Sequence, residues 1–485
     1  MRRDAPVFAA AVVIAVLVSF FTGATAAHRK VVSAGTAPVT GRTLVCPVIN
    51  GLPLHTTASG VVADVGAALS PPVRGAGTVT ATVLAGIGKS PARKLRPAPT
   101  AAVHSKANVS QAVAITATGT IAGTVVADGV SETSSGRYRA LAGGGCLAPQ
   151  TDWWFAGGNG RLGFTDRLIL ANPSNSQANV AVTVWTPHGV DAPPRLADIR
   201  IPPLSRQSIG ILAVAPDIDT VAMHVHAESG AVTAAIVDRR SSGLNSNGGD
   251  LVPPTLPPNR HQVVAGLPAG TGTRTLVVAN PGTSDTTVTV KVVTAQGEYT
   301  PSSVKPIDVG PGRTATADLT KAFGTGSGAV VVDSDHPVLA QVRTMIVPSG
   351  PKLRPDLSWA AATQPLSGPA AVAIGRDPDG GVCVLMLSAP EGDASVRITT
   401  PSGGDQVVHV DARHSVSVDI TDTVRAKSGD WPFVVTPIGD APVYATRQLY
   451  FSGAHGALVT TEPIAPLPSP IPLPRVRQDP RIAVR

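Results

Sequence analysis

The sequence predicts an all-β protein in which immunoglobulin-like β-sandwich domains follow one another, behind an N-terminal apolar helix. The first observation is composition: the 485 residues include 49 glycines and 45 prolines, and only 15% are charged. Short strands joined by tight turns suit this composition better than long helices do. The second observation is a hairpin pattern that returns with the period of one small domain. The third is length, which favours three or four domains over a single core.

The repeated pattern is an apolar strand that stops at a proline, a turn, and a second strand rich in valine. Proline cannot donate a hydrogen bond to a sheet, and the residues after it are turn formers. The prolines of the three copies lie 108 (281 − 173) and 109 (390 − 281) residues apart. The copies are Leu-Ile-Leu-Ala-Asn-Pro-Ser at 168–174, Leu-Val-Val-Ala-Asn-Pro-Gly at 276–282 and a worn version at 384–391. Each copy therefore predicts a β-hairpin.

Each copy continues with a strand, a short segment of helical character and two closing strands that end near an arginine. About seven strands per hundred residues is what an immunoglobulin-like sandwich needs. Proline-rich joints favour semi-stiff spacers, so we expect these sandwiches to stack along the chain. The expected sandwiches cover residues 150–258, 259–366 and 367–463, and the helical segments cover 211–214, 318–323 and 419–424.

The N-terminal segment, residues 1–27, predicts export. Arg2 and Arg3 precede an uncharged, mostly apolar run over residues 5–27. This run fits a signal peptide cleaved after Ala26, and it is also long enough to anchor the chain in a membrane; its length favours the anchor. Residues 28–43 are small and polar and suggest a stalk. The expected location is extracytoplasmic in either case.

The block at residues 44–149 is predicted to be a separate, divergent β domain. Its apolar segments alternate like half-buried strands, but it lacks the Asn-Pro signature. Cys46 and Cys146 lie at its two ends, and an oxidising compartment favours a disulfide between them over two buried free thiols. Cys383 lies in an apolar run and is expected in the core. The tail, residues 464–485, is rich in proline and arginine and predicts an extended or disordered segment.

A resemblance to a known family rests on two motifs. Cys-x-x-Pro-x-x-Asp-Trp-Trp-Phe occupies residues 146–155, and Leu-Ala-Asn-Pro at 170–173 precedes a valine-rich strand. These motifs resemble an uncharacterised family of exported actinobacterial proteins. The resemblance implies an exported or membrane-anchored envelope protein with tandem sandwich repeats. It implies no activity, because the family has none assigned.

Catalytic and nucleic-acid-binding functions find little support in the sequence. A Gly-x-Ser-x-Gly nucleophile motif does not occur. The net charge of +7 comes from scattered basic residues, whereas nucleic-acid binders concentrate them on one face. We therefore expect no enzymatic activity, no catalytic residue, no cofactor and no nucleic-acid partner.

Three short motifs suggest ligand sites but have simpler explanations. Residues 158–163 match Gly-x-Gly-x-x-Gly, yet a dinucleotide site needs a helix after the glycines, and another apolar run follows them. His224 and His226 would share one face of a strand, but the sequence places no third metal ligand, so ordinary strand histidines are favoured. The acidic segment 377–381 lacks the glutamate of a calcium loop and favours a turn.

Trp153 and Trp154 are the candidate contact residues. Adjacent strand residues point to opposite faces, so one ring is expected in the core of the second domain. The other ring either packs against the first domain, which is favoured, or forms an exposed platform for a glycan. Two functions follow. The first is a non-enzymatic envelope scaffold that binds another envelope protein. The second is an accessory protein of glycan synthesis that binds carbohydrate, peptidoglycan or another cell-wall polymer.

Overall fold

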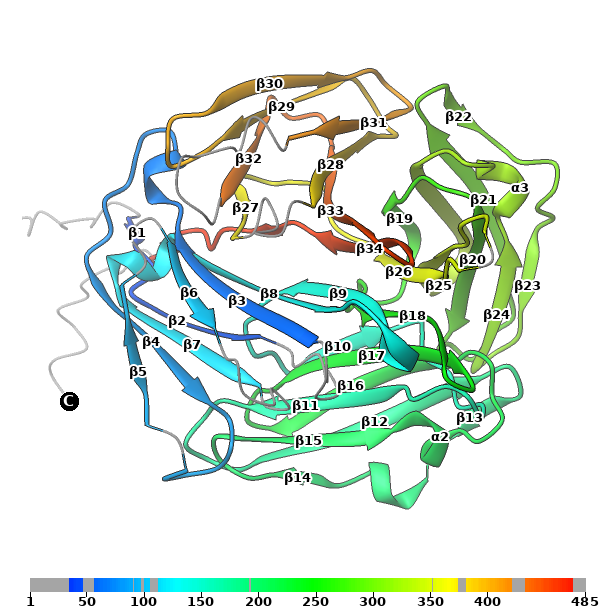
Figure 1. The fold of residues 1–485 in the computed structure, drawn as a ribbon, viewed down its shortest axis with the longest axis horizontal. Helices are drawn as coiled ribbons and strands as arrows, with labels where there is room; N and C mark the ends of the chain where they lie inside the picture. The colour runs from blue at the N-terminus through cyan, green and yellow to red at the C-terminus, as the bar shows by residue number, and fades with distance from the viewer. Residues whose placement is uncertain are drawn as a thin grey trace, which may run out of the picture. The chain divides into compact units, whose positions relative to one another are not determined.

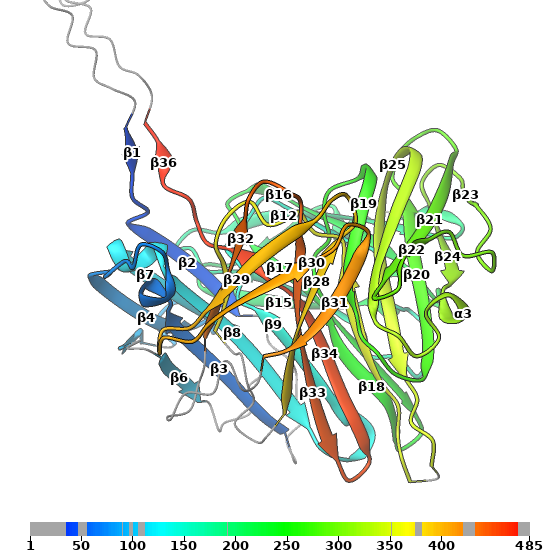
Figure 2. The ribbon, with the colours of Figure 1, turned by 90° about the horizontal axis from the view of Figure 1, so that it is seen from above.

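The structure, a computed structural model, describes residues 35–46, 56–89, 91–96, 100–104, 112–191, 193–350, 352–373, 381–420 and 432–473. It is 59% strand and 5% helix, which confirms the all-β prediction. The chain divides into two compact units, and the larger one spans Thr40–Pro468. In the smaller unit, β1 (Thr36–Ala37) pairs antiparallel with β36 (Ile471–Pro472) (Figure 2).

The large unit contains four groups of strands, which we call the first to fourth repeats. The strands of the second repeat, in chain order, are β10 (Asp152–Phe155), β11 (Arg167–Asn172), β12 (Ala178–Thr186), β13 (Gly189–Asp191), β14 (Ile199–Ile201), β15 (Ser205–Gly210), β16 (Ala222–Ser229), β17 (Thr233–Ser242) and β18 (Asn245–Val252). One sheet has the order β15-β11-β17-β18; in the other, β10, β16 and β12 are neighbours, and β13 and β14 also pair with β12. Alternate valines of β12 are buried against residues of β11 and β17, so the two sheets enclose one core.

The first repeat has the same pairing scheme, although its sequence lacks the Asn-Pro signature. Its two sheets have the orders β2-β7-β4-β5 and β6-β3-β8-β9. These strands are β2 (Gly41–Cys46), β3 (Thr56–Asp64), β4 (Gly77–Val83), β5 (Arg93–Leu95), β6 (Thr100–His104), β7 (Val113–Gly119), β8 (Val125–Thr133) and β9 (Ala140–Gly145). The expected disulfide is present between Cys46, at the end of β2, and Cys146, next to the end of β9.

The third and fourth repeats follow the scheme again. In the third, one 19-residue strand, β25, serves both sheets, and Arg313 pairs in parallel with Thr186 of β12. Both sheets of the third repeat and one sheet of the second therefore form one continuous sheet of 13 strands. The strands of the third repeat are β19 (Asn259–Leu267), β20 (Gly272–Asn280), β21 (Thr286–Thr294), β22 (Gly297–Tyr299), β23 (Ile307–Val309), β24 (Arg313–Asp318), β25 (Gly328–Ile346) and β26 (Asp356–Ala361). Those of the fourth are β27 (Ala370–Val372), β28 (Val382–Ala389), β29 (Ala394–Thr399), β30 (Asp405–Val410), β31 (His414–Asp419), β32 (Phe433–Ile438), β33 (Tyr444–Gly453), β34 (Gly456–Pro463) and β35 (Ala465–Pro466).

The period predicted from the sequence is a structural repeat. Pro173, Pro281 and Pro390 each follow the last residue of a strand, namely β11, β20 and β28. Asn172 and Asn280 are fully buried and make the same bonds. In each, the side-chain amide donates to the carbonyl oxygen four residues later (2.7 Å in both) and to a carbonyl of β14 (3.1 Å) or β23 (3.0 Å). The Asn-Pro motif therefore stabilises the turn between the two strands by satisfying buried carbonyl groups. The predicted hairpin is wrong, because β11 pairs with β15 and β17, whereas β12 pairs with β13, β14 and β16. The turn leads from one sheet to the other, and the same holds for β20 and β21 and for β28 and β29, which do not pair with each other.

Two of the predicted helical segments are single helical turns. They are α2 (Ile211–Val214) and α3 (Thr320–Phe323), which follow β15 and β24. Most of the third segment, and the acidic segment 377–381 except for its last residue, lie outside the described residues. The predicted apolar segment at residues 5–27 also lies outside them. In the described part of the chain, no helix combines the length and apolar character needed to cross a membrane.

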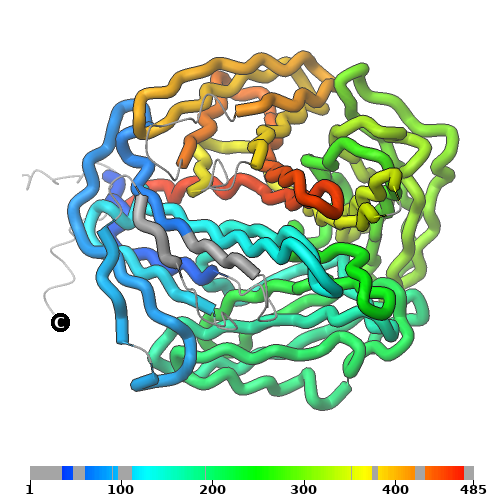
Figure 3. The backbone as a smooth tube through the Cα atoms, in the orientation of Figure 1, coloured from blue at the N-terminus to red at the C-terminus, as the bar shows by residue number. Residues whose placement is uncertain are grey.

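The four repeats close into a cycle, which corrects the expectation that they stack end to end. Each repeat contributes one inner strand, namely β9, β18, β26 and β34. β9 contacts β18, β18 contacts β26, β26 contacts β34, and β34 contacts β9 (Figure 1). The fourth repeat therefore lies beside the first, as the orange and blue segments of Figure 3 show. Residues about 300 positions apart meet at this junction, and local sequence patterns carry no information about such a contact.

Three glycines make this closure possible. Gly143, Gly144 and Gly145 form the end of β9, which contacts both β18 and β34. A Cβ atom on Gly145 would lie 2.6 Å from a Glu462 carboxylate oxygen, and one on Gly143 would lie 3.1 Å from the Thr460 methyl group. Side chains larger than hydrogen would hold β9 away from β34.

The first residues of the predicted tail also belong to the fold. Ile464 is buried in the core that the first and fourth repeats share, and β35 pairs with β27. Residues 474–485 lie outside the described residues. The structured part of the chain thus extends past residue 463 because an apolar side chain and an open sheet edge are available to it.

Candidate functional site

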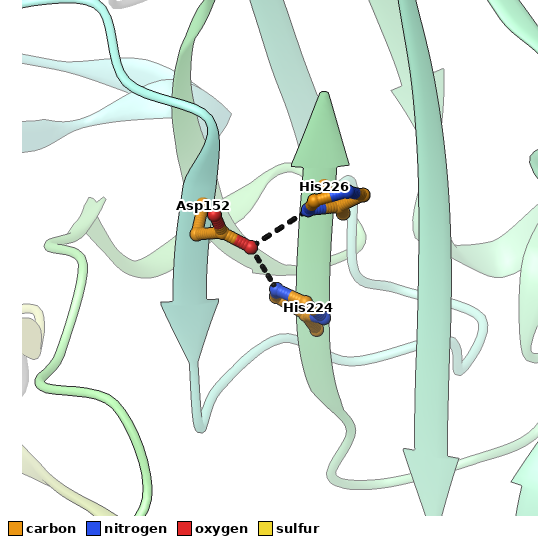
Figure 4. Close-up of side chains that lie close together, drawn as sticks. All are labelled: Asp152, His224 and His226. Carbon is orange, nitrogen blue, oxygen red and sulfur yellow. Dashed lines mark hydrogen bonds and ion pairs between the residues drawn. The ribbon is translucent and has the colours of Figure 1, made fainter. Parts of the chain in front are cut away.

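The most distinctive cluster of polar side chains joins two strands of the second repeat. Asp152 lies on β10, and His224 and His226 lie on the neighbouring strand β16 (Figure 4). Antiparallel pairing sets Asp152 opposite His226 and Trp154 opposite His224. Alternate strand residues share a face, so all four side chains project from the same side of the sheet.

The other face of β10 belongs to the core. Trp153 and Phe155 are buried there, and the indole N–H of Trp153 donates to the Val232 carbonyl oxygen at 2.8 Å. This is where the sequence placed one of the two tryptophans. Because side chains of β10 alternate between the two faces of the sheet, Asp152 and Trp154 lie on the face opposite the core.

One carboxylate oxygen connects the two imidazoles. Asp152 Oδ1 lies 2.9 Å from His224 Nε2 and 2.8 Å from His226 Nδ1. The other oxygen, Oδ2, accepts a hydrogen bond from the Thr151 hydroxyl at 2.8 Å. The side chains of Asp152 and His226 are 43% and 48% exposed, whereas that of His224 is 20% exposed, so solvent reaches the cluster from one side.

The surroundings shift the pKa values of two of these groups. Burial opposes ionisation of Asp152, but hydrogen bonds from His226, Thr151 and His224 outweigh it and hold the carboxyl pKa at about 2. Burial lowers the pKa of His224, and Asp152 only partly offsets this effect. At neutral pH the cluster therefore presents a carboxylate and a neutral imidazole, which are the protonation states that metal ligands need.

Trp154 supports the cluster instead of presenting a free ring. It is partly buried, and its ring stacks on His224 with centroids 3.7 Å apart and on Trp185 at 5.9 Å. Its carbonyl oxygen accepts a hydrogen bond from Thr255 N at 2.8 Å, and the Thr255 hydroxyl donates to Ala340 O of the third repeat at 3.0 Å. The backbone of Trp154 is thus tied, through the proline-rich connector, to the third repeat.

The sequence found two of these residues as a group but not the third. His224 and His226 are visible as a His-x-His pair, while Asp152 is 72 residues away from His224. Only the register between β10 and β16 brings it to them. A second cluster, Asp393, His409 and Asp411, is exposed and contains a single imidazole.

The other suggested ligand motif has a structural role. Two glycines of this motif pack against the helical turn α2 and the residue that ends it. A Cβ on Gly158 would lie 2.8 Å from Ile211 Cδ1, and one on Gly160 would lie 1.7 Å from the Ala215 carbonyl oxygen. The next element is the strand β11, not the helix that a dinucleotide site requires. Cys383 is buried, and burial raises its thiol pKa to about 12, so it stays a neutral core side chain.

Buried acids gather where the inner strands meet, and no local sequence pattern predicts them. Asp250, on β18, accepts hydrogen bonds from the Thr460 hydroxyl (2.8 Å) and from Trp359 N (3.2 Å). Asp356, on β26, accepts from Val459 N (2.9 Å) and from Gly249 N (3.2 Å). Each of these carboxyl groups therefore links its own inner strand to two others. Spacing along the chain cannot predict such contacts, because the partners belong to three different repeats.

These acids make stability depend on pH. Burial raises the pKa of Asp356 to about 7, although its N–H donors and Arg139 oppose this effect. Burial also raises the pKa of Glu462, to about 8. A folded-state pKa above the unfolded value means that the stabilisation is full below about pH 4 and is lost as pH rises through 7 to 8. We expect the free energy of unfolding to fall by several kcal/mol between pH 4 and 8, since about 3 pKa units correspond to about 4 kcal/mol. Urea unfolding across this range measures it.

Asp356→Asn provides the control for this prediction. The amide cannot ionise, so this variant should show a flatter dependence than the wild type between pH 4 and 7. An unchanged slope in the variant would show that Asp356 is not the group responsible. Stability that rises with pH in the wild type over this range would contradict the prediction as a whole.

Comparisons with known proteins place the chain near proteins without an assigned activity. The model of a family of unknown function (DUF5719) matches residues 100–427, which is more than half of the chain. A search of curated proteins finds no match. A crystal structure from Thermotoga maritima is 14% identical and covers 22% of this chain and 96% of its own, with a TM-score of 0.19.

Two larger solved structures match over 86% of this chain but with lower scores. One is an α-L-rhamnosidase from Streptomyces avermitilis in complex with L-rhamnose (11% identity, 56% of that chain, TM-score 0.11). The other is the pilus adhesin SpaC from Lactobacillus rhamnosus GG (10% identity, 57% of that chain, TM-score 0.10). At these scores none of the three supports a statement about this protein's function.

Proposed function

Because the chain belongs to a family of unknown function (DUF5719), we propose its role from the architecture: a non-enzymatic, extracytoplasmic scaffold of the cell envelope. The observation that carries the proposal is the closed cycle of inner strands. It joins the last repeat to the first through buried side chains, for example between Arg447 of β33 and Asp128 of β8. A cycle closed in this way resists relative movement of the repeats, which suits a protein that holds other components in place.

Two features support an extracytoplasmic location. The Cys46–Cys146 disulfide joins the two ends of the first repeat, and disulfides persist in oxidising compartments. The apolar segment 5–27 has the length and the preceding basic residues of an export signal or a membrane anchor. The proposal includes an N-terminal membrane anchor and, following the motif resemblance, an actinobacterial source. We also assign the sandwiches to the immunoglobulin-like class, which two antiparallel sheets of this size favour.

A structural role for the most perturbed acids supports the non-enzymatic part of the proposal. Asp250 and Asp356 are fully buried, and their carboxylate oxygens accept hydrogen bonds from neighbouring inner strands. Perturbed carboxyl groups often mark catalytic sites, but groups whose oxygens are used in this way act as buried links between strands. These hydrogen bonds of Asp250 and Asp356 stabilise the contacts between inner strands that close the cycle.

The proposed partner is another envelope protein, and binding of a cell-wall polymer is the alternative outcome of the test. The geometry gives the polymer little support at Trp154, since a sugar platform needs an open ring face and this ring stacks on His224 and Trp185. Both outcomes keep the protein at the envelope. They differ in which surface of the chain is required.

Complementation of a deletion strain tests the proposal. We expect the full chain to be found in the envelope fraction, with Cys46 and Cys146 joined in non-reducing peptide maps. Variants that weaken closure of the cycle, such as Arg447→Met, should lose complementation in step with their loss of thermal stability. Trp154→Leu and Asp152→Asn, at matched abundance, should complement.

Two results would contradict it. Free alkylated Cys46 in native envelopes would remove the basis for the location. A stable, folded Trp154→Leu variant that fails to complement and no longer binds purified wall polymer would favour the glycan-binding alternative. A folded Asp152→Asn variant that fails to complement would favour a catalytic or ligand-dependent role over a scaffold.

A further inference from the structure

Asp152, His224 and His226 combine two imidazoles and one carboxylate on a solvent-facing surface. One ligand atom of each lies within 4.8 Å of the others. We propose that these three residues bind one zinc ion, which fastens β10 to β16. The proposal is independent of the scaffold function, so the failure of one leaves the other standing.

The distances require only a small adjustment. Zinc binds imidazole nitrogen and carboxylate oxygen at about 2.0–2.2 Å, so tetrahedral ligands lie about 3.3 Å apart. Here Asp152 Oδ1 is 2.9 Å from His224 Nε2 and 2.8 Å from His226 Nδ1. Moving each nitrogen outward by about 0.4–0.5 Å, through small side-chain rotations, makes room for the ion.

The proton arrangement is compatible with this change. In the hydrogen-bonded state, Nε2 of His224 and Nδ1 of His226 donate to the same carboxylate oxygen. Zinc needs the lone pairs of these two nitrogens. Each imidazole therefore moves its proton to its other ring nitrogen when the ion binds, and the bound site keeps two neutral imidazoles and one carboxylate.

Neighbouring residues hold the ligands in position. The Thr151 hydroxyl donates a hydrogen bond to Asp152 Oδ2 at 2.8 Å, so that Oδ1 stays directed at the histidines. The Trp154 ring lies nearly parallel to the His224 ring, with 7° between their planes, and restricts its rotation. Ordered metal sites depend on such outer contacts as well as on the ligands themselves.

The ligand set selects the ion. Two imidazoles and a carboxylate suit zinc, whereas calcium and magnesium prefer sites built from oxygen atoms. The fourth position is left for water, because Asp152 and His226 are nearly half exposed. The ion would connect β10, an end strand of its sheet, to β16. Its ligand Asp152 lies six residues after Cys146 of the disulfide (152 − 146).

Zinc binding to the purified full chain is the direct test. The protein is stripped with a chelator, dialysed against zinc chloride and assayed for zinc by mass spectrometry, and competition with a chromogenic chelator gives the affinity. We expect one high-affinity ion per chain that is lost in His224→Ala and in Asp152→Asn. Affinity should fall more than about 100-fold in each, because loss of a ligand exceeds the 10–100-fold effect of an outer contact.

Matched variants separate this site from ordinary surface binding. Thr151→Ala should weaken binding by roughly tenfold, as an outer contact does. His409→Ala, in the exposed cluster with one imidazole, should bind zinc like the wild type. Equal zinc loss in His409→Ala and His224→Ala, or equal retention in both, would overturn the proposal.

Cobalt(II) gives a second measurement that does not depend on the folding of any variant. One equivalent added to the wild type should produce the intense visible bands of a tetrahedral ion, and zinc should displace them. Hydrogen exchange in β10 should slow when zinc is added. A wild-type chain that shows neither the bands nor slower exchange does not bind the ion as proposed.

Discussion

Replacing Arg447 by methionine should lower the free energy of unfolding by about 3–5 kcal/mol, the usual cost of breaking a buried ion pair from one side. Arg447 is fully buried, donates a short hydrogen bond to Glu462 of the adjacent strand and forms an ion pair with Asp128 of the first repeat at 3.5 Å. Asp128 matters as well as Glu462, because methionine would leave both buried carboxyl groups without the guanidinium group of Arg447. Denaturant unfolding of the purified chain measures the change.

The Glu462→Gln variant is the matched control. Burial raises the pKa of Glu462 to about 8, with Arg447 opposing and Asp128 adding to this effect, so the Glu462 carboxyl group is largely protonated at neutral pH. An uncharged glutamine therefore replaces a group that is already largely neutral and should cost much less than Arg447→Met. A larger cost for Glu462→Gln than for Arg447→Met would show that this charge assignment is wrong.

The position of Arg447 also predicts where the structure will loosen. Its side chain joins the fourth repeat to the first, so in Arg447→Met hydrogen exchange should increase most in the inner strands β9 and β34. An even increase over all four repeats would contradict a specific role in closing the cycle.

Replacing Trp359 by alanine should cost a similar amount, about 3–5 kcal/mol. Trp359 belongs to β26 of the third repeat, but its ring is buried in the core of the second. Its indole N–H donates to Asp238 Oδ2 at 2.9 Å, and its ring atoms would lie 2.9 Å from a Cβ on Gly157. Truncation would leave a cavity between two repeats, and thermal or denaturant unfolding measures its cost.

Two further variants separate the cavity from the hydrogen bond. Trp359→Phe keeps most of the volume and loses the N–H, so we expect about 1–2 kcal/mol. Gly157→Ala should destabilise the wild type, because its Cβ meets the Trp359 ring, and should cost less when Trp359 is already alanine. Additive effects of Gly157→Ala and Trp359→Ala would show that the two residues are not in the contact described.

The candidate site was only half visible in the sequence. His224 and His226 were found from their spacing because strand alternation is a local property. Asp152 was seen only as part of a motif with Trp153 and Trp154, since its place beside the histidines depends on the register between β10 and β16. Trp154 was expected to contact the first domain or a glycan, whereas its ring stacks on His224 and Trp185.

The sequence by itself determined the β class, the period of the last three repeats, the strands that end at Asn-Pro and the pairing of Cys46 with Cys146, but not that the turn after Asn-Pro leads into a different sheet. Each of these depends on patterns a few residues long or on a small number of cysteines in an oxidising compartment. Only the tertiary structure decided that the first repeat shares the scheme, that β34 meets β9, and that Arg447 reaches Asp128. The physical reason is that these contacts join residues far apart in the chain, where packing and burial, not local backbone preference, select the partner.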